Sequence, residues 1–76
     1  MMNQFTIYAT DTCQWCKRAK ELLTERGLPY KYKLLKTSKD IEEFQREFPG
    51  RTSVPQIITP DGRKIGGYDS LLQLLG

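Results

Sequence analysis

Two cysteines separated by two residues, Cys13 and Cys16, are the only cysteines in this 76-residue chain, which has no histidine. They follow an apolar run that predicts a strand, and they open a run with helical periodicity. A Cys-x-x-Cys pair at such a junction is typical of redox-active dithiols, because the two sulfurs can form and break a disulfide within one helical turn. The pair therefore indicates chemistry carried by the sulfurs themselves.

Other roles for the cysteine pair fit the composition less well. A structural zinc site takes about four ligands, whereas this chain offers two thiols and no imidazole. A structural disulfide that closes so short a loop would stabilise the fold little. An inert buried pair is the remaining alternative. We therefore expect no metal site, and a catalytic role for the pair.

The apolar pattern predicts seven elements in the order β-α-β-α-β-β-α. The expected strands are 4–8, 30–35, 56–59 and 63–65,. A right-handed crossover makes the first two strands parallel, and the Pro-Asp-Gly turn at 60–62 makes the last two an antiparallel hairpin. This order predicts an α/β fold with one mixed four-stranded sheet flanked by three helices.

The ends of the helices have clear sequence signals. Residues 10–12, Thr-Asp-Thr, supply candidate caps for the first helix, and Gly27 is expected to end it,. Ser38 or Asp40 is expected to cap the second helix. Ile41, Phe44 and Phe48 recur at helical spacing and predict the buried face of that helix.

The expected first helix gives the two cysteines different environments. Cys13 falls at its N-terminus, where free backbone N–H groups and the helix dipole favour an anion and lower the pKa of a thiol. Cys16 falls one turn inward, on the same face as Ala19, and can donate a hydrogen bond to the outer sulfur. The exposed charges of Lys17 and Arg18 are expected to add little. Cys13 is therefore predicted to be the exposed nucleophile and Cys16 the buried resolving thiol.

The bulk properties predict one domain, 1–76, in a reducing compartment. No stretch approaches the roughly 18 apolar residues of a membrane span, and the first residues lack a secretory pattern,. We therefore expect a cytoplasmic protein without a membrane partner, where a Cys-x-x-Cys pair is more often catalytic than structural.

The net charge of +3 does not by itself indicate nucleic-acid binding. Lys31, Lys33, Lys36 and Lys39 are interleaved with apolar residues in and after the second expected strand. Lysines placed in this way protect an exposed sheet edge from pairing with other chains. We therefore expect no nucleic-acid partner.

Three blocks of sequence resemble motifs of the dithiol glutaredoxin family. They are IYATDTCQWC at 7–16, TSVPQ at 52–56 and GGYD at 66–69. In this order and spacing the similarity covers nearly the whole chain. It implies a thioredoxin fold and a glutathione-dependent thiol–disulfide oxidoreductase with a redox-active Cys13–Cys16 disulfide. The implied substrates are disulfide-containing or glutathionylated proteins, with ribonucleotide reductase as an acceptor by family analogy.

The resemblance also implies where glutathione binds. Val54, beside a cis Pro55, would pair its backbone with the cysteinyl part of glutathione as an added strand. The turn before the last helix would hold the γ-glutamyl end, with Asp69 accepting from its ammonium group. Arg51 would contact the glycine carboxylate. The implied glutathione-binding residues are Thr10, Cys13, Trp15, Arg51, Ser53, Val54, Pro55, Gly67, Tyr68, Asp69 and Ser70.

Several of these assignments have simpler alternatives. Pro55 can open an edge strand, and Arg51 can be a solvated loop charge. Trp15 can be buried in the core instead of forming an aromatic wall beside the ligand. The last helix can begin with an ordinary turn in which Ser70 and Gln73 form a capping box,.

The chain departs from the family pattern between and before the cysteines. Gln14-Trp15 replaces the usual Pro-Tyr, and Thr10 stands where a lysine is frequent. The first change is expected to alter the reduction potential, and the second removes a cation near the site.

Two other functions remain open at this stage. Some glutaredoxins without the proline bind a [2Fe–2S] cluster between two subunits, but bulky Gln14 and Trp15 disfavour that close dimer, so a monomer is expected. A redoxin reduced by thioredoxin reductase is the other alternative, and the retained GGYD block disfavours it.

Overall fold

Four strands and three helices make up the computed structural model, which describes residues 4–76. The elements are β1 (Phe5–Ala9), α1 (Gln14–Glu25), β2 (Tyr30–Leu34), α2 (Ser38–Glu47), β3 (Gln56–Ile58), β4 (Lys64–Gly66) and α3 (Tyr68–Leu75). The strands form one sheet in the order β2-β1-β3-β4. β1 is parallel to β2, whereas the other two pairs are antiparallel. The predicted element order and mixed sheet are confirmed, and the strand boundaries differ from the predicted ones by no more than one residue.

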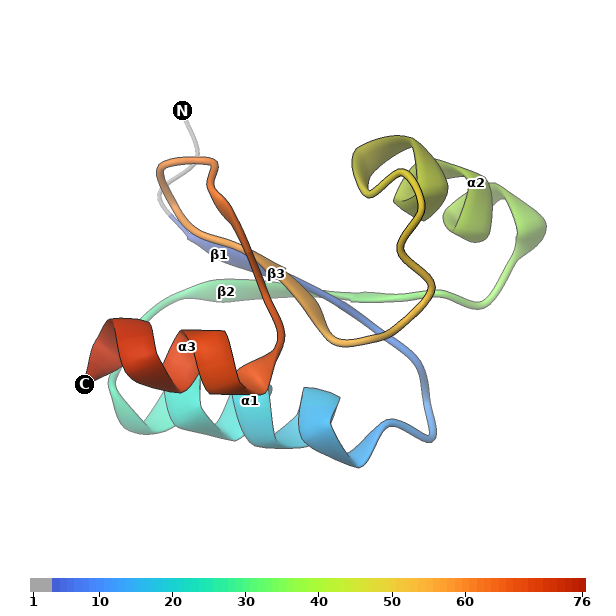
Figure 1. Ribbon diagram of the computed structural model, residues 1–76. Coiled ribbons are helices and arrows are strands. Elements are labelled where there is room, and N and C mark those ends of the chain that lie inside the picture. Colours follow the sequence, from blue (N-terminus) through green and yellow to red (C-terminus); the bar gives the residue numbers. More distant parts are fainter. Residues whose placement is uncertain (1–3) are drawn as a thin grey trace.

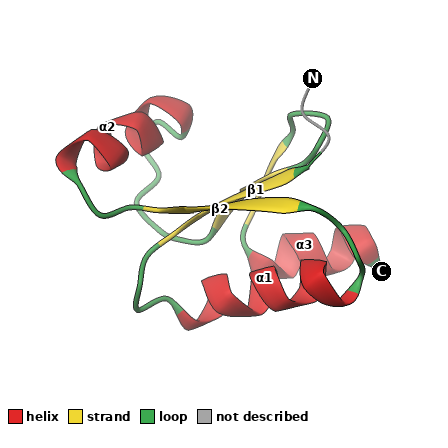
Figure 2. Ribbon diagram, turned by 180° about the vertical axis from the view of Figure 1, so that it is seen from behind, coloured by secondary structure: helices red, strands yellow, loops and turns green. Residues whose placement is uncertain are grey.

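The sheet is the middle layer of the molecule. Helices α1 and α3 lie together on one face, and α2 covers one end of the other face, as both ribbon views show (Figures 1 and 2). The molecule has a hydrophobic core on each face of the sheet, and β1 contributes side chains to both. Successive side chains of a strand point to opposite faces. Phe5, Ile7 and Ala9 join the core under α1 and α3, whereas Tyr8 packs with Phe44 under α2.

Helix α1 carries a buried stripe and a definite end. Its buried residues are Cys16, Ala19, Leu22 and Leu23. Gly27 adopts a left-handed φ of 67° after the helix, and the N–H of Leu28 donates to the carbonyl of Leu23 at 2.9 Å. This pattern is a Schellman motif, for which glycine is the favoured residue. The predicted stop at Gly27 is confirmed.

The predicted N-terminal caps of the first two helices were wrong by a few residues. Cys13 caps α1 through its own sulfur, and no hydroxyl or carboxylate of residues 10–12 does so. Thr37 caps α2: its hydroxyl accepts from the N–H of Asp40, whose carboxylate accepts in return from the N–H of Thr37. Ser38 is the first helical residue instead of the cap. The cap is the extended residue just before the first helical one, and α1 begins later and α2 earlier than the sequence suggested.

The predicted buried face of α2 is only partly buried. Phe44 and Phe48 pack against Tyr8, but 45% of the surface of Ile41 is exposed. The helix covers one end of the sheet, so that its first turn extends past the core (Figure 1).

Strand β2 is an edge of the sheet. Lys31 and Lys33 lie on it as expected, whereas Lys36 follows it and Lys39 lies in α2. Lys33 bonds to Glu43 on α2 at 3.2 Å. Partial burial lowers the pKa of Lys33, but its contacts with Glu43 and Tyr8 raise the pKa by more, so the net shift is upward. The charged edge fits protection against strand pairing.

No helix within residues 4–76 is long and apolar enough to cross a membrane.

Candidate active site at the Cys13–Cys16 disulfide

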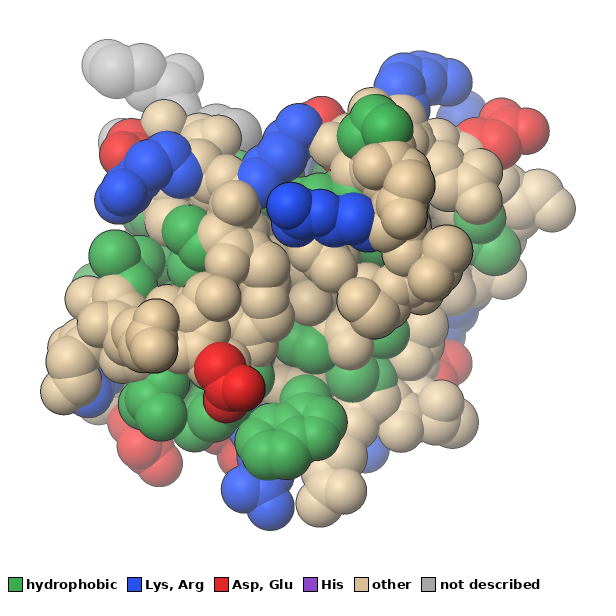
Figure 3. Space-filling model, viewed as in Figure 1, with side chains coloured by type: hydrophobic (Ala, Val, Ile, Leu, Met, Phe, Trp, Pro, Cys, Tyr) green, Lys and Arg blue, Asp and Glu red, His purple; other side chains and the backbone are tan. Residues whose placement is uncertain are grey.

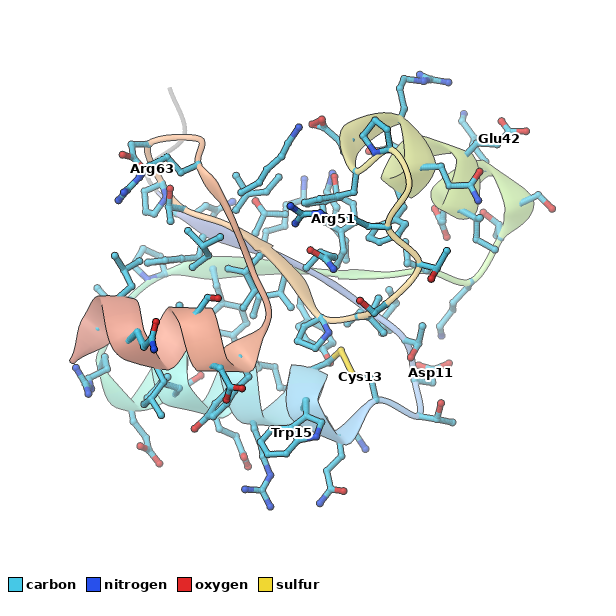
Figure 4. The ribbon with its side chains drawn as sticks, viewed as in Figure 1. Asp11, Cys13, Trp15, Glu42, Arg51 and Arg63 are labelled. Carbon is cyan, nitrogen blue, oxygen red and sulfur yellow. A yellow bond between two sulfur atoms is a disulfide. The ribbon has the colours of Figure 1, made fainter. Side chains whose placement is uncertain are left out.

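The two cysteines form a disulfide at the start of α1, directly after the carboxyl end of β1 (Figure 4). Their Cα atoms are 5.3 Å apart. Cys16 is fully buried, whereas Cys13 is partly exposed. A reagent in solution therefore reaches the sulfur of Cys13 and not that of Cys16. This difference in exposure agrees with the separate roles that the sequence predicts.

The backbone at the start of α1 is arranged to stabilise a negative charge on the outer sulfur. The N–H of Cys16 donates to Sγ of Cys13 at 3.1 Å. The first turn holds no acidic residue that would compete for the free N–H groups or repel an anion. Helix dipoles and unpaired N–H groups at an N-terminus favour a thiolate there.

Within residues 4–76, neither positive side chain next to the cysteines donates a hydrogen bond to a sulfur. Arg18 places its guanidinium carbon 5.0 Å from the centre of the Trp15 ring, and Lys17 is exposed. Arg63, in the turn between β3 and β4, and Glu42, on α2, lie far from the sulfurs (Figure 4). The positive group that contacts the sulfur of Cys13 is thus a backbone N–H of α1.

The segment before β3 contains the cis peptide between Val54 and Pro55. Gln56, buried as the first residue of β3, fixes this loop. Its side-chain amide donates to the carbonyl of Ser53 at 3.1 Å and accepts from Nη1 of Arg51 at 3.0 Å. Sequence reasoning did not assign Gln56 a role in the site, although a polar residue in an otherwise apolar strand is the signal that could have identified it.

A cavity of about 480 Å³ lies between the start of α1 and the start of α3. It is lined by Trp15, Val54, Pro55, Gly67, Tyr68, Asp69 and Ser70. Seven of the residues assigned from the sequence therefore line one cavity next to the disulfide-bearing turn. Figure 3 shows the same face of the molecule as Figure 1. Apolar side chains are exposed there below the Lys and Arg side chains that lie near the centre of the view.

Two more of the assigned residues, Thr10 and Arg51, lie on the other side of Val54. Thr10, Arg51 and Val54 line a second hollow of about 250 Å³, between the active-site loops and α2. Ser53 lines neither hollow, but it is exposed between them, and its hydroxyl accepts from Gln56 at 3.3 Å. Val54 is the residue that the two hollows share.

The start of α3 lacks a side-chain cap. Gly67 is the N-cap residue and makes no side-chain hydrogen bond, so the alternative capping box of Ser70 and Gln73 is wrong. Gly66 before it has a left-handed φ of 96°, which turns the chain sharply into the helix. The first N–H groups of α3 are therefore free of side-chain partners and lie at the 480 Å³ cavity.

Trp15 forms part of the wall of this cavity and is not buried in the core. It is 53% exposed, and its ring centre lies 5.4 Å from that of Tyr68. The two rings join the first turns of α1 and α3 across one edge of the cavity. The alternative of a buried Trp15 is therefore wrong.

Arg51 extends from the loop after α2 toward the middle of the active-site face (Figure 4). Besides its bond to Gln56, its guanidinium carbon lies 5.9 Å from the centre of the Phe48 ring. It makes no ion pair with a carboxylate of residues 4–76. The guanidinium of Arg51 is thus held in place by Gln56 and Phe48, and it can still pair with the carboxylate of a ligand.

A dithiol at the start of the first helix, on a mixed sheet of this order, is the site of a thiol–disulfide oxidoreductase with the thioredoxin fold,. The family model for glutaredoxins matches residues 5–65. The chain belongs to the glutaredoxin family, and its Cys13–Cys16 pair fits the dithiol type.

Individual relatives agree with this assignment. Glutaredoxin 3 of Escherichia coli K12 is 37% identical over 73 residues, which cover 96% of this chain and 87% of the relative. The solution structure of a Brucella melitensis glutaredoxin has a TM-score of 0.75 at 32% identity and covers 97% of this chain and 79% of the other. The buckwheat glutaredoxin–glutathione complex has a TM-score of 0.77 at 27% identity, with coverages of 93% and 66%.

Proposed function

We propose that the protein reduces protein disulfides and glutathione mixed disulfides, with glutathione as the reductant. The observation that carries the proposal is the pairing of a partly exposed Cys13 at a helix N-terminus with a fully buried Cys16. Glutathione as the reductant is supported by the similarity to a glutaredoxin crystallised with glutathione. It is also supported by the cavity that lies beside the cysteines.

The proposed reaction consists of successive thiol–disulfide exchanges. The thiolate of Cys13 attacks one sulfur of the substrate disulfide, forms a mixed disulfide and releases the other sulfur as a thiolate that takes up a proton. Cys16, deprotonated, then attacks the sulfur of Cys13, which releases the second substrate thiol and leaves the Cys13–Cys16 disulfide. Two glutathione molecules reduce this disulfide and leave as glutathione disulfide.

The proposed glutathione pose uses both hollows. The γ-glutamyl end lies at the uncapped start of α3, where the free N–H groups suit its carboxylate and Asp69 suits its ammonium group,. The backbone of Val54 pairs with the cysteinyl residue, and the glycine carboxylate points toward Arg51. Thr10, Pro55 and Tyr68 line the path, and Trp15 covers one side. Ser53 is exposed beside Val54. We expect the protein to act in a reducing compartment such as the cytosol, as a monomer.

Single cysteine variants test the proposal and the two roles. Cys13→Ser is expected to remove all glutathione-coupled turnover, since the attacking sulfur is lost. Cys16→Ser is expected to retain turnover of a glutathionylated peptide, which needs only Cys13, and to lose most turnover of protein disulfides. Turnover is measured as glutathione disulfide formed.

Two results would contradict the proposal. Equal loss of activity toward the glutathionylated peptide in both variants would refute the separate roles. Turnover supported by thioredoxin reductase and not by glutathione would refute glutathione as the reductant.

A further inference from the structure

The 250 Å³ hollow on the α2 side of Val54 has an apolar floor. Leu35, Ile41, Phe44 and Val54 supply this floor, and Thr10, Gln45, Arg51 and Thr52 supply the rim. The half-exposed Ile41 is the unexpected member, because its spacing in α2 predicts burial. A large apolar side chain left half-exposed in a hollow can be covered by a bound partner.

The apolar floor exceeds what glutathione can use. In the proposed pose the glycine end of glutathione points toward this hollow and Arg51. Glycine has no side chain, and its carboxylate needs the cation at the rim and not Leu35 or Ile41 below it. A longer polypeptide has a side chain at the same position, and that side chain can fill the hollow.

We propose that this hollow selects polypeptide substrates in which an apolar residue directly follows the reactive cysteine. The inference rests on the proposed function and extends it to the class of protein substrate. Continuity with the active site supports this occupant: Val54 lines both hollows, and Thr10, which also lines this one, is three residues before Cys13. A peptide sulfur at Cys13 therefore places its neighbouring residue next to the apolar floor.

The proposed glutathione pose gives the direction of the bound segment. The exposed carboxylate of Asp69 lies at the α3 cavity, and the unpaired guanidinium of Arg51 lies at the α2 hollow. In that pose the γ-glutamyl end lies at the α3 cavity, and the glycine residue, which follows the cysteinyl residue, lies toward Arg51. We expect a polypeptide that pairs with the backbone of Val54 to run in the same direction. The residue that enters the α2 hollow is then the one on the C-terminal side of the cysteine.

Symmetrical disulfide dimers of short peptides test the proposal. Two peptides are compared that differ only in the residue after the cysteine, leucine in one and glycine in the other. Because each sulfur carries the same peptide, attack by Cys13 always places that peptide in the site. Burial of the leucine side chain is expected to raise kcat/KM by about tenfold over the glycine peptide.

Variants of Ile41 then locate the source of this preference. Ile41→Ser is expected to reduce the leucine-to-glycine ratio to about two, whereas Ile41→Leu keeps the apolar surface and retains the ratio. Leu74→Ser is the matched control, because Leu74 is 43% exposed, against 45% for Ile41, but lies near the end of α3. It should leave the ratio unchanged. Thermal unfolding of each variant shows that it is folded.

The outcomes separate this inference from the proposed function. Turnover of both peptides at equal rates by the wild type, or a ratio unchanged by Ile41→Ser, would overturn the inference and leave the proposed function intact. Absence of glutathione-coupled turnover with every disulfide would overturn both. A concentration-dependent dimer that Ile41→Ser disrupts and Leu74→Ser does not would assign the hollow to self-association, and so would also overturn the inference.

Discussion

The three helices of this small protein begin in three different ways. Helix α2 has a complete capping box, in which Thr37 and Asp40 satisfy each other's backbone N–H groups. Helix α1 has only the sulfur of Cys13 as its cap, and α3 has Gly67 and no side-chain cap. The oxygen cap that stabilises a helix is absent at the two starts that border the active site. At α1 the cap position is taken by the reactive sulfur, and at α3 the backbone donors stay without a side-chain cap, as the proposed binding of a ligand carboxylate requires,.

The largest expected effect comes from giving α3 the cap that it lacks. In Gly67→Asp the new carboxylate bonds to the first N–H groups of α3. A ligand carboxylate then loses those donors and meets a like charge. Because a hydrogen bond to a charged group contributes about 1.5–3 kcal/mol, we expect at least a tenfold weaker binding of glutathione, measured by calorimetry on the protein with both cysteines intact.

Gly67→Ala is the matched control for this experiment. A Cβ at residue 67 would lie 3.6 Å from the carbonyl oxygen of Pro55, an ordinary contact, so the added carbon that both substitutions share fits. The alanine variant adds the same carbon without an oxygen and should bind glutathione within about twofold of the wild type. Equal weakening in both variants would mean that the cavity wall, and not the free N–H groups, governs binding.

Removal of the cap of α2 is expected to lower the stability of the fold and to leave turnover unchanged. Thr37→Ala removes the hydroxyl that accepts from the N–H of Asp40 and should lower the free energy of unfolding by about 1 kcal/mol. Turnover of a glutathionylated peptide should stay the same at temperatures where the variant is folded. Denaturant unfolding measures the first effect, and the glutathione-coupled assay measures the second.

The pH dependence of unfolding provides a second measurement of the same cap. Hydrogen bonds from the N–H groups of Lys36 and Thr37 hold the pKa of Asp40 below its ordinary value of 3.8. Since the folded-state pKa is the lower one, the carboxylate stabilises the fold above pH 3.8, and this contribution is lost as the pH falls through the folded-state pKa. The gap in stability between the wild type and Asp40→Asn should therefore shrink in acid. A gap that is constant with pH would contradict this role.

These helix starts also show what the sequence could predict and what it could not. The order of elements followed from period-2 and helical patterns, and Gly27 marked the end of α1 because few other residues adopt its left-handed φ,. The caps were mispredicted because residues 10–12 and 37–40 each offer several suitable oxygens. In α2 the oxygen of Thr37 acts, whereas in α1 none of these oxygens acts and the sulfur of Cys13 is the cap. The residue that becomes the cap is decided by backbone angles, and these are set by the path of the loop.

The arrangement of the site could also be predicted only in part from the sequence. The sequence could predict the cysteine pair and, through the resemblance, could propose Arg51, Ser53–Pro55 and Gly67–Ser70 as site residues. It could not show that these residues line two hollows joined at Val54. It also could not show that Ile41 stays half exposed, because burial of a helical stripe depends on where the helix sits over the sheet.

The smallest expected effect concerns the charge of the first turn of α1. Gln14 is exposed next to Cys13, in a turn without acidic residues. Since a unit charge about 7 Å away in water changes an anion's energy by roughly RT, Gln14→Glu should slow alkylation of reduced Cys13 at neutral pH by about two- to threefold. Gln14→Lys should accelerate it by a similar factor, and added salt should reduce both effects.

A charge control separates this local effect from a change in net charge. Gln73→Glu adds the same charge at an exposed residue in the second half of α3 and should leave the alkylation rate of Cys13 unchanged. If Gln14→Glu and Gln14→Lys both leave the rate unchanged, the hydrogen bond from the N–H of Cys16 is sufficient to activate the sulfur. The absence of an acidic residue from the start of α1 would then have no role in the chemistry, and the contrast with α2 would be limited to the caps themselves.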